Sequence, residues 1–149
     1  TMSVPPTITA HTGMDAITQC FESFITRKEA PIPRTLALQG LKLALPALGP
    51  VVRDGTLRPE REAMAHAALL SGIALANSGL GLAHGVAAAL GIQAQVPHGL
   101  ACAVMLVPAL RCNLAVAESR LAELARELLP RTPGSDHGAA SALIEHLAA

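Results

Sequence analysis

Apolar residues recur at helical spacing near the start of the chain. Met14, Ile17 and Phe21 fall on one side of a helix with 3.6 residues per turn. Thr12, followed three residues later by Asp15, has the spacing of a capping box variant. Together these signals predict a helix over residues 13–26.

Similar apolar periodicity continues to the end of the chain. Pro59 with acidic residues around it is typical of a first helical turn, and Pro46 is expected to limit or kink an earlier helix. We expect further helices over residues 36–48, 59–77, 82–90, 98–112 and 121–129, and a last one that begins near Asp136. Because no alternating pattern indicates a strand, the sequence predicts an all-α fold, a multi-helix bundle, with residues 1–149 as one domain.

Composition supports one compact domain. The 149 residues are 51% hydrophobic, 15% charged and only 1% aromatic, which excludes a disordered chain and requires close packing of small side chains. Eleven Lys and Arg balance eleven Asp and Glu. Without a net basic field, we expect no nucleic-acid partner.

Charged residues are unevenly distributed. The 48 residues from Ala63 to Leu110 contain no Asp, Glu, Lys or Arg, which is typical of either a protein core or a membrane hairpin. Polar residues and glycines interrupt the run too often for a clean apolar stretch that crosses a bilayer. We therefore expect the centre of a folded core and no membrane.

The termini and cysteines indicate the setting. Cys20, Cys102 and Cys112 are odd in number and lie in or beside apolar stretches, so they are expected to be reduced thiols of a cytoplasmic protein. The first ten residues lack the basic and apolar regions of a signal peptide. The first residue is Thr, which suggests a piece of a longer protein.

Histidines are the candidates for chemistry in the uncharged run, which holds His66, His84 and His98. His84 and His98 each precede a glycine at the start of a short apolar helix, so the two rings are able to converge. A metal-binding role is one interpretation. The alternative is that they are hydrogen-bonded core or capping residues.

One face of the first predicted helix carries Asp15, Gln19 and Glu22. A divalent cation accepts an Asp carboxylate together with two imidazoles. Alternatively, Asp15 is only a capping acid and Glu22 a solvated surface charge.

Four segments together resemble the iron-containing (group III) alcohol dehydrogenase family, which also includes maleylacetate reductases. They are residues 12–24, residues 72–85, Pro97-His98-Gly99 and residues 108–113. The resemblance covers nearly the whole chain. It implies the C-terminal helical domain of an NAD- or NADP-dependent oxidoreductase that interconverts an alcohol with an aldehyde or ketone.

In the family an α/β domain binds the dinucleotide, and the resemblance implies that this domain precedes the present chain and is absent from it. Gly79-Leu80-Gly81 does not replace its glycine-rich loop, because no strand is predicted before it. In the family the active site forms between the two domains, so we expect this chain alone to be inactive.

The family's metal, Fe²⁺ or Zn²⁺, is held by an Asp and three His. Carried over, the resemblance implies Asp15, Gln19, His84 and His98 as ligands of a metal that acts as a Lewis acid on the substrate oxygen. Without the metal, His84 and His98 themselves could be catalytic and polarise that oxygen, as donors or as general acid and base. Gln19 stands where the family has His, and an amide oxygen is the weaker ligand. Ala88 stands where many members have another His.

Other interpretations remain open. Cys102 lies one turn after His98 and is interpreted as core packing. A maleylacetate-reductase-like enzyme would need basic groups for carboxylates, from Arg34, Arg53 or another domain. A non-catalytic helical interaction module would leave the histidines in the core. Exposed apolar surface is expected to favour a homo-oligomer.

Overall fold

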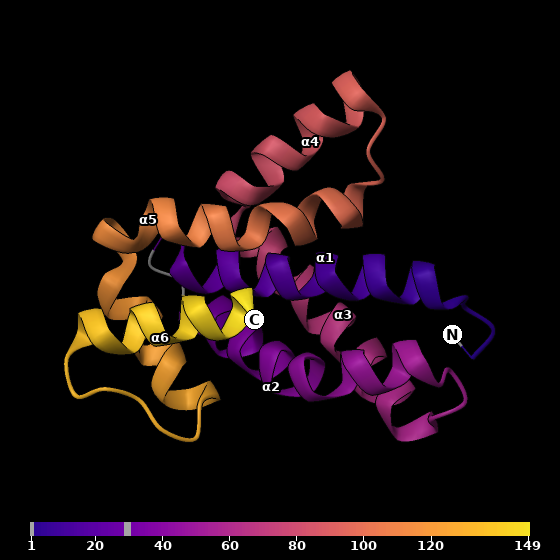
Figure 1. Cartoon of the computed structure of the whole chain (residues 1–149), viewed down its shortest axis with the longest axis horizontal. Helices are drawn as coiled ribbons and strands as arrows, with labels where there is room; N and C mark the ends of the chain where they lie inside the picture. The colour runs from indigo at the N-terminus through magenta and orange to yellow at the C-terminus, as the bar shows by residue number, and fades with distance from the viewer. Residues whose placement is uncertain (1, 29–30) are drawn as a thin grey trace.

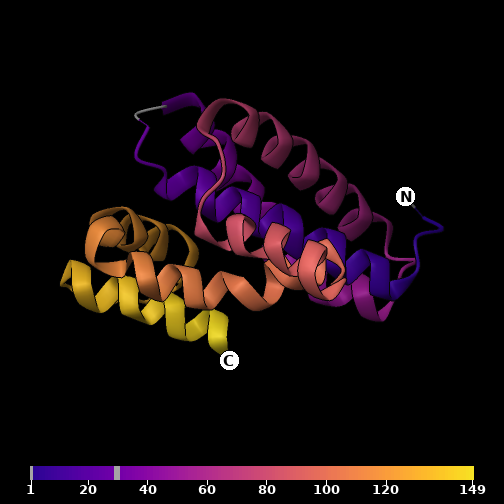
Figure 2. The ribbon, with the colours of Figure 1, turned by 90° about the horizontal axis from the view of Figure 1, so that it is seen from above.

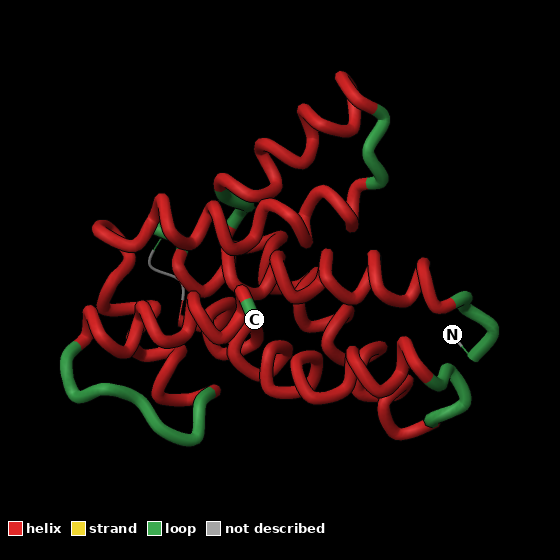
Figure 3. The backbone as a smooth tube through the Cα atoms, viewed as in Figure 1, coloured by secondary structure: helices red, strands yellow, loops and turns green. Residues whose placement is uncertain are grey.

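The computed structural model describes residues 2–28 and 31–149, and within them every regular element is a helix (Figure 1). The six helices are α1 (Pro6–Ile25), α2 (Pro31–Arg53), α3 (Arg58–Ser78), α4 (Leu82–Ala94), α5 (His98–Leu128) and α6 (Asp136–Ala148). Among the described residues, turns and loops join the helices, and the loop between α5 and α6 is the longest (Figure 3). The predicted all-α fold is confirmed.

Helix α1 is the centre of the bundle. It packs against α2, α3, α4 and α5, while α6 packs on α5. Seen from above, α3 lies on one side of α1, and α5 and α6 lie on the other (Figure 2). Phe21 and Phe24 of α1 are fully buried among leucines and alanines, so the few aromatic rings of the chain fill the middle of the core.

The start of α1 differs from the prediction. The helix begins at Pro6, seven residues before the expected start, because proline has the right φ for a first helical position. Thr12 lies inside the helix, where its hydroxyl donates to the Ile8 carbonyl oxygen at 2.8 Å. The predicted capping box of Thr12 and Asp15 was therefore wrong, and the Asp15 carboxylate is available for other contacts.

Two further helices are longer than predicted. Helix α2 continues through Pro46 and Pro50 to Arg53, and α5 joins the segments 98–112 and 121–129 into one helix that contains Pro108. Figure 1 shows that α5 changes direction along its length. An interior proline loses one backbone hydrogen bond, and burial of neighbours such as Leu41 and Leu110 offsets that loss.

The last helix begins where predicted, at Asp136. Ser135 precedes it, and the Ser135 side chain accepts a hydrogen bond from the Gly138 amide at 3.1 Å. The third helix, Arg58–Ser78, also agrees with its prediction to within one residue at each end.

Helices α2 and α5 are each long and apolar enough to cross a membrane by length and composition alone, and the bent pair α3 and α4 would count as a third such span. One third of the most apolar window of α2 and of α5 is buried inside the bundle. The two helices also carry Lys42 and Glu127, which pair with each other at 2.6 Å. The expectation that the protein has no membrane partner stays a prediction.

Helix α4 leans away from the rest of the bundle (Figure 1). It packs against α5 and, more sparsely, against α1. Only Ala83, His84 and Ala87 of α4 are buried, and the first two lie in its first turn. The start of α4 is therefore the part that is fixed to the core.

The N-terminal turn of α5 lies directly against the backbone of α1. A Cβ atom added to Gly99 would collide with the backbone carbonyl of His11. Because a main-chain group cannot rotate away as a side chain does, only glycine allows this approach. The contact sets the distance between α1 and the turn that carries His98.

Replacing Gly99 with alanine is expected to destabilise the protein although alanine is the better helix former. The overpacking should lower the free energy of unfolding by about 1–3 kcal/mol. Gly72→Ala is the matched control, because Gly72 is also helical and a Cβ there meets nothing within 4 Å. The control should be neutral or stabilising by up to about 1 kcal/mol. Urea unfolding followed by circular dichroism measures both, and equal effects would contradict the steric argument.

Candidate functional site

Four potential metal-binding side chains converge from three helices. Asp15 comes from α1, His84 from the first turn of α4, and His98 and Cys102 from the first turns of α5. One ligand atom from each residue lies within 4.8 Å of the others. Residues 69 positions apart in the sequence, Asp15 and His84, thus share one small site.

His84 is held between two carboxylates of α1. Its Nε2 lies 3.1 Å from Asp15 Oδ1, and its Nδ1 lies 2.7 Å from Glu22 Oε2. Asp15 and Glu22 are seven residues apart, two turns of the helix, so both face the same ring. The imidazole is 4% exposed, so these carboxylates replace the water that the ring has lost.

Glu22 also fixes the start of α4. The Gly81 and Ala83 amides donate to its carboxylate at 2.9 and 2.6 Å. These amides lie at the N-terminus of the helix, where backbone N–H groups lack intrahelical partners and favour a negative charge. The alternative interpretation of Glu22 as a solvated surface charge was wrong, because Glu22 is only 5% exposed and its carboxylate accepts these hydrogen bonds.

Asp15, Glu22 and His84 shift one another's pKa values. Burial alone would lower the pKa of His84, but hydrogen bonds to Asp15 and Glu22 and their charges raise it to about 9. Burial alone would raise the pKa of each carboxyl group, but the His84 contact holds both pKa values below their ordinary range. A protonated His84 is therefore the main partner of both carboxylates.

His98 and Cys102 complete the cluster from α5. His98 Nε2 lies 3.5 Å from both Asp15 Oδ1 and Cys102 Sγ, and the two imidazole rings lie 5.6 Å apart. The His98 side chain is 53% exposed, so the site opens to solvent on this side. Cys102 is fully buried as expected, and burial followed by the charge of Asp15 raises the pKa of its thiol to about 12.

Gln19 lies on α1 one turn after Asp15, but its amide oxygen is hydrogen-bonded to a residue outside the cluster. Ser71 of α3 donates to the Gln19 amide oxygen at 2.8 Å. That Gln19 binds a metal stays a prediction. His66 of α3, the third histidine of the uncharged run, is exposed and takes no part in the cluster.

The arginines suggested for a carboxylate substrate lie apart from the cluster. Arg34 pairs with Glu123 and lies over the Phe24 ring, 4.7 Å from its centre. Arg53 is exposed in the last turn of α2. Neither contacts Asp15 or His84 among the described residues.

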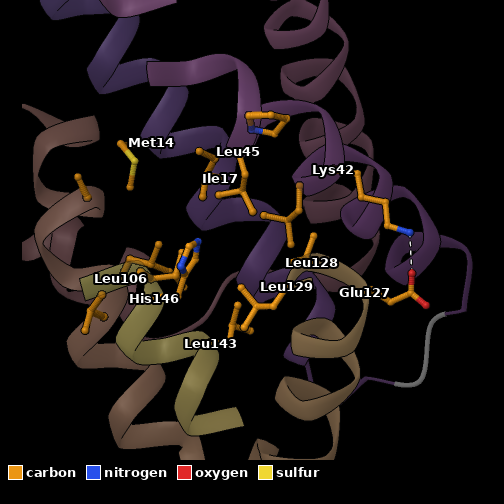
Figure 4. A pocket seen from close by; sticks show the side chains of 15 residues that line it. Met14, Ile17, Lys42, Leu45, Leu106, Glu127, Leu128, Leu129, Leu143 and His146 are labelled. Carbon is orange, nitrogen blue, oxygen red and sulfur yellow. Dashed lines mark hydrogen bonds and ion pairs between the residues drawn. The ribbon is translucent and has the colours of Figure 1, made fainter. Parts of the chain in front are cut away.

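A separate cavity lies elsewhere in the bundle. Its volume is about 550 Å³, and it lies between α1, α2, α5 and α6 (Figure 4). Apolar side chains such as Leu45, Leu106 and Leu143 form most of its wall, with the Lys42–Glu127 ion pair at one side and His146 also lining it. None of the clustered residues lines this cavity, and its acidic and basic groups do not form a set of metal ligands among the described residues, so the cluster is the candidate site.

Comparison with known proteins identifies relatives of the whole chain. The model of the Fe-containing alcohol dehydrogenase family, C-terminal part, matches residues 9–149. The 1-propanol dehydrogenase PduQ of Salmonella typhimurium is 37% identical in an alignment of 149 positions that covers 98% of this chain and 40% of that protein. The chain thus spans about 40% of the length of this relative.

Solved structures agree. A 1,3-propanediol oxidoreductase superposes with a TM-score of 0.95 at 34% identity, covering 99% of this chain and 39% of that one. A sulfoacetaldehyde reductase from Bifidobacterium kashiwanohense, solved in complex with NAD⁺, gives 0.85 at 31% identity over 99% of this chain and 38% of its own. The fold is therefore that of the corresponding helical part of these enzymes.

Replacing Glu22 with glutamine tests its structural role. The amide keeps one acceptor but loses the charge, and it leaves His84 or a buried α4 amide without its partner. We expect the free energy of unfolding to fall by about 1–3 kcal/mol and hydrogen exchange at the start of α4 to accelerate. Glu62→Gln, which removes only an exposed pair with Arg58, should stay within about 0.5 kcal/mol. Unchanged exchange in α4 would refute the anchoring role.

Proposed function

Because the chain belongs to the Fe-containing alcohol dehydrogenase family, we propose that it is the metal- and substrate-binding part of an NAD(P)-dependent oxidoreductase. The reaction is the interconversion of an alcohol with an aldehyde or ketone. The observation that carries the proposal is the convergence of Asp15, His84 and His98 at one partly open site. A non-catalytic module would have no need for two carboxylates and two imidazoles in such a cluster.

The donor set fits a divalent metal of the Fe²⁺ or Zn²⁺ type. One carboxylate and two imidazoles with a solvent-accessible side match catalytic rather than closed structural sites. Asp15, His84 and His98 would hold the ion. When bound, the ion supplies Lewis-acid polarisation of the substrate oxygen.

The residues of this chain have separate tasks in that reaction. Glu22 accepts a hydrogen bond from the His84 Nδ1–H group, so the other ring nitrogen, Nε2, faces the site. Half-exposed His98 borders the opening through which a small substrate enters. Ala88 on α4 is exposed and has no proton to give, so a proton relay at that position is not provided.

NAD or NADP is the proposed hydride carrier, bound by a part of the protein outside these residues. Among the described residues there is no strand followed by a glycine-rich turn of the dinucleotide-binding type. The NAD⁺ complex of the sulfoacetaldehyde reductase supports the choice of cofactor. The free thiols Cys20, Cys102 and Cys112 suit a cytoplasmic location, and a homo-oligomer remains our expectation for the assembly.

The proposal predicts metal-dependent activity of the whole protein. With 1-propanol or 1,3-propanediol and NAD⁺ or NADP⁺, turnover should be lost after chelation and return with Fe²⁺ or Zn²⁺. His84→Ala should lower kcat/KM by at least about 100-fold, since it removes a ligand together with its buried contacts. His66→Ala is the control, because His66 is exposed and outside the cluster. Full activity in the chelated protein would sink the proposal.

A further inference from the structure

The side chain of Cys102 lies where a fourth metal ligand is expected. Its Sγ belongs to the same group of ligand atoms as Asp15, His84 and His98, all within 4.8 Å. Cys102 follows His98 by four residues on α5, so both side chains leave the same face of that helix. The thiol is fully buried and faces three groups that bind metals.

We propose that Cys102 supplies the fourth protein ligand, in place of the side chain at position 19, and that the resulting Asp/His/His/Cys set selects zinc. This inference rests on the metal dependence proposed above.

The distances fit four protein ligands around one ion, and the solvent-facing side next to His98 leaves room for the substrate oxygen as a fifth ligand. Zn–N and Zn–O bonds of about 2.0 Å and a Zn–S bond of about 2.3 Å place neighbouring ligand atoms roughly 3.3–3.6 Å apart. The observed separations are 3.1 Å for His84 Nε2 to Asp15 Oδ1 and 3.5 Å for His98 Nε2 to Asp15 Oδ1. Cys102 Sγ to His98 Nε2 is also 3.5 Å. Three edges of the coordination tetrahedron are thus already close to their final lengths.

Gln19 is less suited to the position. Its amide oxygen accepts a hydrogen bond from Ser71 at 2.8 Å, which directs the oxygen toward α3. A neutral amide oxygen is also a weak ligand for a transition metal, whereas a thiolate is a strong one. The sulfur therefore compensates for the absence of an imidazole at position 19.

Charge and ligand softness point to zinc. A thiolate at Cys102 and a carboxylate at Asp15 balance the two positive charges of the ion, and both imidazoles bind in the neutral form. Soft thiolate ligands favour zinc over ferrous ion in a site of mixed N, O and S donors. The ion itself displaces the thiol proton, as in other cysteine sites.

Cobalt substitution tests the assignment on the whole protein, cleared of metal and reloaded with Co²⁺. A thiolate ligand gives a sulfur-to-cobalt charge-transfer band in the near ultraviolet, which oxygen and nitrogen ligands do not give. We expect the band in the wild-type protein and in Cys112→Ser, whose exposed thiol lies outside the cluster. We expect it to vanish in Cys102→Ser and Cys102→Ala.

Zinc affinity provides the second measurement. Loss of a residue that only hydrogen-bonds to a metal ligand weakens metal binding by about 10- to 100-fold. Cys102→Ala removes a ligand itself, so it should weaken zinc binding by at least that much. Adding Gln19→His in the Cys102→Ala background should restore much of the affinity without restoring the band, because it returns an imidazole at helical spacing from Asp15. Circular dichroism of each variant confirms that it has folded.

The outcomes separate the two proposals. Co²⁺ binding without the charge-transfer band, together with an unchanged zinc affinity in Cys102→Ala, would mean that Cys102 is only a packing residue beside Ala87 and Ala101. If Asp15→Asn abolishes metal binding in that case, the proposed function stands. If the folded wild-type protein binds neither zinc nor cobalt, both proposals are overturned.

Discussion

The contact of one buried imidazole with two carboxylates organises the functional end of this molecule. His84 is the one titratable side chain of α4, and it is buried. Its two ring nitrogens are hydrogen-bonded to Asp15 and Glu22, which both belong to α1. A lone buried charge costs several kcal/mol, so each of the three groups depends on the other two. Since α4 otherwise leans away from the bundle, this contact also decides where that helix begins.

Periodicity predicted the helical class, and the family resemblance named Asp15, His84 and His98, which the structure brings together. Neither indicated how far each helix extends. Pro46 was expected to limit or kink its helix, and α2 continues through it because tertiary packing outweighs one lost hydrogen bond. Conversely, Pro6 was missed as a starting signal. Local rules for prolines describe an isolated helix, and most of the stability of these helices comes from tertiary packing.

Glu22 is the functional residue whose role the sequence concealed. The helical projection placed it on the face of Asp15, yet its burial depends on α4 docking its first amides there, which is a long-range event. The available signal was the seven-residue spacing of Asp15 and Glu22, which are the only Asp, Glu, Lys or Arg residues of α1. Pairing that spacing with the uncharged, histidine-bearing segment would have indicated a buried ion cluster.

Position 19 on α1 and position 102 on α5 each lie one helical turn beyond a clustered residue, Asp15 and His98. In the proposed metal site, α1 and α5 would therefore each offer a position for the fourth donor. A chain that lacks an imidazole at the position on α1 would complete the coordination from α5, and the metal that the site prefers would change with the donor.

The close approach of Gly99 to the His11 carbonyl means that main-chain shape sets the separation of α1 and α5 at this point. A contact between main-chain atoms does not depend on which side chains line the neighbouring site. A donor such as Cys102 could therefore be exchanged for another side chain while the two helices keep their positions.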